Sequence, residues 1–176
     1  MRFLQNLVEN RRKLVDERTA LSNRLTDLLK LYFPQILGWF DEVASAVVGD
    51  RLQQWPSWQD LQPVKPAKLE MFLRAHHCAE IPERLFQIRQ AIPAAHDRAL
   101  LDSAWYLVTA WVQQMAVWRE SIRQLEKCIE EQAAQQEDWP IFQSLPGAGA
   151  ALAPRLMVAL GTQRDRYSSA SDLQSF

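Results

Sequence analysis

The chain has 176 residues, of which 48% are hydrophobic and 23% are charged, and its formal net charge is −1. This composition is typical of a globular protein and excludes a strongly basic one, so any nucleic-acid contact must come from local clusters of charge. The two cysteines, Cys78 and Cys128, imply no disulfide framework and fit a reducing cytoplasm. No apolar run is long enough to cross a bilayer, so we expect a cytoplasmic protein with no membrane partner.

The first predicted element is a long helix over residues 1–33, which Pro34 ends. Arg11, Arg18 and Arg24 on this helix are candidate contacts to a nucleic-acid backbone, because the first two fall in an apolar stripe where an unpaired charge is costly. The alternative is a solvated face whose charges pair at spacings of three or four residues. The stripe advances in steps of three and four residues and consists of Leu4, Leu7, Arg11, Leu14, Arg18, Leu21, Leu25, Leu28 and Tyr32.

Residues 34–99 are predicted to be linker helices. Their expected elements are a short apolar helix over 35–47, a proline-rich connector over 49–68, and helices over about 67–78 and 82–92.

Two groups of neighbouring residues have the right chemistry for a metal site but the wrong spacing. His76, His77 and Cys78 are consecutive, and so are Asp16 and Glu17. Consecutive residues on a helix point in different directions, and no second cluster completes four ligands. We therefore predict no metal site in this chain.

Residues 100–137 give the longest helical pattern. Its tryptophans argue against a two-stranded zipper and favour a wider bundle or a helical hairpin. Because one chain is not expected to cover so long a stripe, we predict a homo-oligomer that associates through residues 101–129. The apolar stripe consists of Leu101, Ala104, Val108, Trp111, Met115, Trp118, Ile122, Leu125 and Ile129. With almost no β-pattern in the sequence, the predicted fold is all-α, a helical bundle with long coiled-coil-like helices.

Two short helices joined by a glycine turn are predicted at the start of residues 138–176. Asp138 and Pro140 open the first helix, Pro146 ends it, and Gly161 closes the second. The Leu-Pro-Gly-x-Gly turn between them predicts a C-terminal helix-hairpin-helix segment.

Gly147 and Gly149 in this turn predict a contact to phosphate. Glycine adopts backbone conformations closed to other residues and lets a ligand approach the main chain closely. The N–H groups that begin the second helix favour an anion, and Arg155, Arg164 and Arg166 can add positive charge. The alternative is a tight turn in which glycine serves geometry alone.

Both ends of the chain resemble one protein family. The segment LPGAGAALAPRLMVALGTQRDRYSSASDLQSF resembles the start of the C-terminal transposase domain of the insertion sequence 110/116/902 family. The segment LVENRRKLVDERTALSNRLTDLLKLYFPQIL resembles the helix that ends the N-terminal nuclease domain of that family, and the middle helices correspond to its linker and coiled coil. The resemblance implies DNA transposition by site-specific recombination, with DNA and a bridge RNA as partners and a divalent metal such as magnesium as cofactor.

The catalytic residues of that family belong outside this chain. Its metal-binding acidic set belongs upstream of residue 1, and its nucleophilic serine belongs downstream of the final DLQSF. We therefore expect a transposase cut at both ends, with no catalytic residue and no cofactor of its own, and whether it acts in an enzyme stays open. No base stands near the serines of the C-terminal turn and cap, which are Ser168, Ser169, Ser171 and Ser175.

Three functions remain open from the sequence. The first is a transposase fragment that binds a DNA or RNA backbone and associates with itself. The second is a helical interaction module without enzymatic activity, which uses the stripe over 101–129. The third is a small protein of the DNA-repair type built on helix-hairpin-helix binding. Salt-dependent DNA binding separates the first and third from the second.

Overall fold

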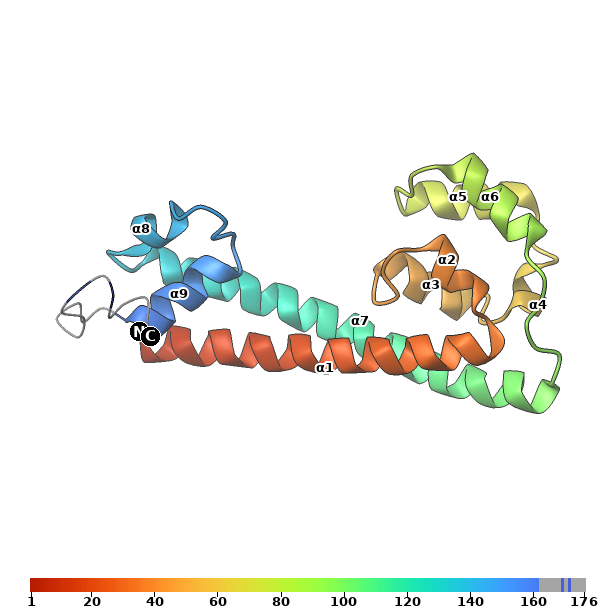
Figure 1. Ribbon diagram of the computed structural model, residues 1–176, viewed down its shortest axis with the longest axis horizontal. Helices are drawn as coiled ribbons and strands as arrows, with labels where there is room; N and C mark the ends of the chain where they lie inside the picture. Colours follow the sequence, from red (N-terminus) through yellow and green to blue (C-terminus); the bar gives the residue numbers. More distant parts are fainter. Residues whose placement is uncertain (162–168, 170, 172–176) are drawn as a thin grey trace. The chain divides into compact units, whose positions relative to one another are not determined.

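The structure is a computed structural model that describes residues 1–161, 169 and 171. Over these residues it is all-α and contains no strand, which confirms the predicted fold class (Figure 1). The helices are α1 (Arg2–Tyr32), α2 (Gln35–Trp39), α3 (Ala46–Gln54), α4 (Trp58–Leu61), α5 (Pro66–Ala75), α6 (Ile81–Gln90), α7 (Arg98–Ala134), α8 (Trp139–Gln143) and α9 (Leu152–Leu160). Among the described residues, no helix combines the length and the apolar composition that crossing a bilayer requires.

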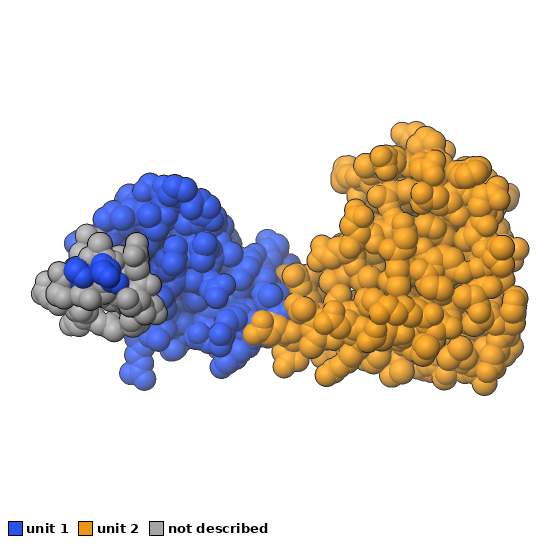
Figure 2. Space-filling model, in the orientation of Figure 1, with its two compact units in different colours: residues 1–15, 120–176 blue, residues 16–119 orange. Residues whose placement is uncertain are grey.

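The chain divides into two compact units (Figure 2). Unit 1 consists of residues 1–15 and 120–176, and unit 2 consists of residues 16–119. Helices α2 to α6 therefore belong to unit 2 and helices α8 and α9 to unit 1, while α1 and α7 contribute residues to both units.

Unit 1 is built around a small and mainly aliphatic core. Its part of α1 runs antiparallel to its part of α7, with α8 and α9 packed on them (Figure 1). Helices as short as α8 and α9 do not hold by themselves, so their order depends on the side chains that they bury. The buried core residues of unit 1 are Leu4, Leu7, Val8, Ile129, Ala133, Phe142, Ala153 and Met157.

Unit 2 has a larger core that is rich in aromatic rings. Phe33 and Trp39 meet edge to face with their ring centroids 5.7 Å apart, and Trp55 meets Phe72 in the same way at 5.4 Å. Such pairs add to the free energy gained by burying their large surfaces. The buried aromatic residues of this core are Tyr32, Phe33, Trp39, Phe40, Trp55, Trp58 and Phe72.

A single arginine side chain, that of Arg51, is buried inside the core of unit 2. Its guanidinium lies 4.2 Å from the ring centroid of Phe33, and its Nη1 donates a hydrogen bond to the carbonyl oxygen of Trp55 at 2.5 Å. Nη2 is buried and has no hydrogen-bond partner among the described residues. Burial lowers the pKa of Arg51 to about 9. The electrostatic interactions of Arg51 with Tyr32 and Asp60 favour the charged guanidinium and partly oppose this shift.

The predicted helix over 35–47 and the predicted connector over 49–68 are both wrong in detail. The chain forms α2 and then restarts as α3, because the hydroxyl of Ser45 accepts the N–H of Val48 and caps a new helix. Inside the expected connector, Ser57 and Asp60 form a capping box that starts α4. The prolines of this segment stand between helices or in a first turn, where they delimit helices rather than prevent them.

The apolar stripe of residues 101–129 forms part of the cores of this chain. Ala104, Val108 and Met115 are buried in unit 2, and Ile129 is buried in unit 1. The expectation of self-association rested on a stripe that one chain would leave uncovered. The chain covers these four residues itself, whereas the remaining large side chains of the stripe, Leu101, Trp111, Trp118 and Leu125, are only partly buried. The homo-oligomer therefore stays a prediction.

Candidate nucleic-acid interface

The turn between α8 and α9 in unit 1 carries the glycine pair of the sequence (Figure 1). Helix α8 starts after Asp138 with Pro140 in its first turn, although the Asp138 side chain makes no capping hydrogen bond to the helix. Helix α9 ends at Gly161, whose φ of 69° is open to glycine at little cost. The start of α8 and the end of α9 therefore lie close to the predicted positions. The other two ends differ more, because α8 ends at Gln143, before Pro146, and α9 begins only at Leu152.

Gly147 is required by the conformation of the chain. The N–H of Ala148 donates to the carbonyl oxygen of Leu145 at 3.0 Å, which closes a four-residue turn with Pro146 and Gly147 at its centre. The φ of Gly147 is 78°, the value that the third residue of a type II turn adopts. Proline fixes the φ of the second position and glycine supplies the positive φ of the third, so this glycine has a sufficient structural reason.

Gly149 has no such reason. Its φ is not in the positive region, and a Cβ added to it would meet no atom of the described residues within 4 Å. Any small side chain would therefore fit at this position within the chain itself. The absence of a side chain would matter to a group that approaches the turn from outside.

The hydrogen-bond donors that remain open are those of the turn rather than those of helix α9. The sequence predicts that the first N–H groups of the second helix face an anion. In the structure, the N–H groups of Leu152 and Ala153 both donate to the carbonyl oxygen of Gly149 at 3.0 Å. Pro154, the next residue, has no N–H. The N–H groups of Ala150 and Ala151 have no partner among the described residues, so they are the donors next to Gly149 that are available to an anion.

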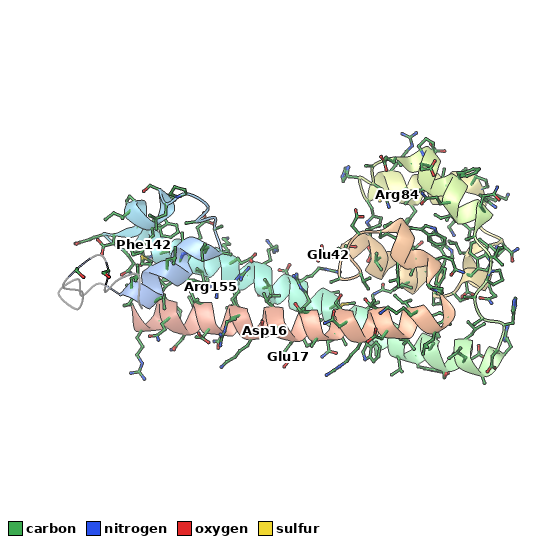
Figure 3. The ribbon with its side chains drawn as sticks, in the orientation of Figure 1. Asp16, Glu17, Glu42, Arg84, Phe142 and Arg155 are labelled. Atoms are coloured by element: carbon green, nitrogen blue, oxygen red, sulfur yellow. The ribbon has the colours of Figure 1, made fainter. Side chains whose placement is uncertain are left out.

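Arg155 stands one turn further along α9 and is exposed (Figure 3). Within the part of the chain that the structure describes, no carboxylate pairs with it. On the opposite side of its helix, Ala153 and Met157 are buried with Phe142 of α8, which fixes the direction of α9. The guanidinium is therefore free to add positive charge beside the open N–H groups.

Three exposed apolar side chains around the turn were missed in the sequence. Ile141 is 48% exposed, Leu145 is 39% exposed and Leu152 is 42% exposed. All three lie in an apolar segment, and an apolar segment normally predicts buried residues. Which of these side chains face the core depends on where α8 ends and α9 begins, and the sequence placed those helix ends imprecisely.

Arg11, which the sequence places in the apolar stripe of α1, has a partner from its own chain. Its Nε and Nη2 both donate to Oε1 of Glu126 on α7, at 2.9 and 2.5 Å. The arginine side chain is 20% exposed and the glutamate side chain is 47% exposed. This pair within unit 1 explains how the stripe accommodates a charge without nucleic acid.

The remaining candidate residues lie apart from the turn or outside the description. Arg18 is half-buried and Arg24 is exposed, both in unit 2, and neither has an ion pair with a described residue. Arg164 and Arg166 lie outside the described residues, as do Ser168 and Ser175.

Neither residue group considered for metal forms a site of three or more ligands among the described residues. Asp16 and Glu17 are both exposed on α1 (Figure 3). His76 places its Nε2 3.5 Å from Oδ2 of Asp50 and packs its ring on Phe72. These contacts give His76 a structural role at the end of α5.

Comparison with known proteins found no matching family model, no matching curated protein and no matching solved structure.

Proposed function

We propose that this chain binds the backbone of a nucleic acid through the turn between α8 and α9. In this proposal α8, the turn and α9 act as a helix-hairpin-helix unit, and α1 and α7 pair in a coiled-coil-like manner. The resemblance of the two ends to the insertion sequence 110/116/902 family makes a transposase the source of such a segment, with DNA or a bridge RNA as the partner. A divalent metal such as magnesium would then belong to acidic residues that the resemblance does not assign to this chain.

The observation that supports this proposal is the difference between the two glycines. Gly147 is explained by its φ of 78°, whereas Gly149 has neither a positive φ nor a neighbour that a Cβ would meet. Next to Gly149, the N–H groups of Ala150 and Ala151 have no described partner. A phosphate oxygen accepts such N–H groups and needs the close approach that only glycine allows.

An interaction module built on the stripe over 101–129 has less support. Val108 is 0% exposed and Met115 is 1% exposed, so these side chains already have partners inside the chain. A partner protein would have to displace them from the core of unit 2.

The proposal is tested by titrating a labelled duplex of arbitrary sequence and following its fluorescence anisotropy. Gly149→Val places a branched side chain where the phosphate would approach, and Gly38→Val is the matched control. Gly38 is also exposed, has a φ outside the positive region and leaves open space at its Cβ position. We expect Gly149→Val to weaken binding by about tenfold, the loss of one or two charge-assisted hydrogen bonds, and Gly38→Val to leave it unchanged.

Salt dependence adds a second measurement to the same assay. Replacing Arg155 by Gln should reduce the slope of log K against log salt by about 0.9, the value for one phosphate contact, whereas Arg74→Gln should not change it. Arg74 is an exposed arginine on α5 that is paired with Glu70. If wild type and a folded Gly149→Val variant bind the duplex with equal affinity, the turn has only a structural role and the proposal is refuted.

A further inference from the structure

A second candidate site lies in unit 2, where the end of α3 and the start of α4 meet the first turns of α7. The structure has a cavity of about 320 Å³ there, open to solvent on one side. Its volume is at the small end of ligand pockets, which suits a single side chain or ring rather than a long molecule. The residues that matter to its chemistry are Gln53, Gln54, Asp60, Arg98, Asp102 and Trp105.

Acceptors of hydrogen bonds dominate the lining of this cavity. Asp60 uses its Oδ2 to accept the N–H and the hydroxyl of Ser57 at 3.1 and 2.6 Å, and no described residue donates to its Oδ1. Among the described residues, the ion-pair partner of Asp102 is Arg98, at 4.0 Å, with both side chains largely exposed. So long an ion pair between exposed groups is weak, and two carboxylates against one guanidinium leave the cavity negative.

Trp105 supplies an aromatic wall. It is 43% exposed, although tryptophan is a residue that folding normally covers. The ring of Tyr106 meets it edge to face with centroids 4.8 Å apart. An exposed indole beside carboxylates is an arrangement that attracts a cation to the face of the ring.

We propose that this cavity binds the guanidinium group of an arginine side chain from a basic peptide segment of a partner protein. Guanidinium is planar, stacks on tryptophan, and has five N–H donors and no acceptor, which matches a lining of carboxylates and amide oxygens. The main competitor is a nucleotide, whose base would also stack on Trp105. Its phosphate would be repelled by Asp60 and Asp102, and among the described residues of the lining Arg98 alone is a cation. The proposal does not depend on the turn between α8 and α9.

The test titrates the full chain with N-acetyl-arginine amide and follows amide and indole N–H signals by NMR. The indole signal of Trp105 is assigned by its loss in Trp105→Phe, which also weakens the attraction of the ring for a cation. N-acetyl-lysine amide and adenosine monophosphate serve as the competing probes. We expect the arginine probe to shift the Trp105 signal at lower concentration than either competitor.

Two charge variants decide the identity of the ligand. Asp102→Asn should weaken binding of the arginine probe by about threefold, and Arg98→Gln should strengthen it about threefold because it frees Asp102, each effect being that of a single exposed ion pair. Arg74→Gln, which removes the same charge at an exposed position of α5, is the control and should have no effect. A nucleotide site predicts the opposite sign for Arg98→Gln. Preferential binding of the nucleotide, or no shift with the arginine probe up to its solubility limit, would overturn the proposal.

Discussion

Each of the two units holds an arginine in a distinctive position. The two arginines differ in their exposure and in their partners, and this difference distinguishes a charge that packs inside the fold from one that a ligand can reach. Arg51 in unit 2 is 2% exposed, lies over the ring of Phe33 and donates to a main-chain carbonyl. Arg155 in unit 1 is exposed and has no ion pair with a described residue. A charge that the fold surrounds contributes to packing, whereas a charge that it leaves open beside unpaired N–H groups is available to a ligand.

The cores of the two units differ in the same sense. Unit 2 buries several large aromatic rings against each other, and the large surface that these rings bury stabilises its short helices. Unit 1 buries mainly aliphatic side chains, with Phe142 as the buried ring among its described residues.

The largest effect is expected for Met115→Glu. Met115 is 1% exposed in the core of unit 2, so this change buries a carboxylate without a partner and should lower the free energy of unfolding by about 4 kcal/mol or more. Urea denaturation followed by circular dichroism measures the loss. Val117→Glu is the control, because Val117 on the same helix is 64% exposed and should change stability by less than about 0.5 kcal/mol.

The same variant distinguishes a core stripe from an association stripe. If residues 101–129 mediated self-association, Met115→Glu would lower the oligomeric state and leave a folded protomer. Sedimentation of the two variants beside the wild type decides between these outcomes, and a stable Met115→Glu protomer would contradict the packing described above.

A pH-dependent effect is expected at Arg51. Burial holds the pKa of Arg51 at about 9, far below the ordinary value of arginine. As pH rises from about 9 to 10, the native state releases a proton that the unfolded state keeps, so the free energy of unfolding should rise, by at most about 1.4 kcal/mol per pH unit. The uncharged variant Arg51→Met lacks this titration. The free energy of unfolding of the wild type should therefore rise relative to that of the variant over that interval.

Urea denaturation at pH 8, 9 and 10 measures this difference. The series stops at pH 10, because burial raises the pKa of Tyr32 and ionisation of the unfolded tyrosine lowers stability beyond that point. A difference that stays constant over the series would mean that Arg51 remains charged in the native state.

Sequence patterns predicted the long helices well and the middle of the chain poorly. The stripes of α1 and α7 repeat over many turns, so periodicity alone located them. Helices α3 and α4 are short and depend on the caps of Ser45 and Ser57. Ser45 falls inside the apolar pattern that predicted one helix over 35–47, and the signal of Ser57 was outweighed by the neighbouring prolines.

The candidate site was predicted in part. The position of the glycine turn was predicted from its spacing, and Arg155 was a candidate for its positive charge. Which N–H groups remain open depends on the two hydrogen bonds that Gly149 accepts, and no sequence pattern encodes them. The partner of Arg11 was not foreseen either, because Glu126 is 115 residues away along the chain and only the packing of α1 on α7 brings them together.

The two glycines should respond to alanine with opposite signs. Gly147→Ala forces a side chain into a positive φ and should lower the free energy of unfolding by about 1 kcal/mol. Gly149→Ala meets no steric obstacle and reduces the freedom of the unfolded chain, so it should be neutral or stabilising by about 0.5 kcal/mol. Thermal unfolding of the two variants side by side measures the difference. Equal losses at both positions would show that Gly149 also has a conformational role.

A small effect is also expected for the ion pair between Arg11 and Glu126, which lies within unit 1. A double-mutant cycle with Arg11→Gln and Glu126→Gln should give a coupling free energy of about 0.5 to 1 kcal/mol, because the arginine is largely covered but the glutamate is half-exposed. The coupling should fall at 0.5 M salt if the pair is as open to solvent as these exposures indicate.

The single variant Glu126→Gln also tests the alternative role of Arg11, since it releases the guanidinium and removes a negative charge. If Arg11 serves only the packing of α1 on α7, nucleic-acid affinity should change by less than about twofold, the general effect of one distant charge under screening. A gain well above that, lost again in the double variant, would return Arg11 to the nucleic-acid interface.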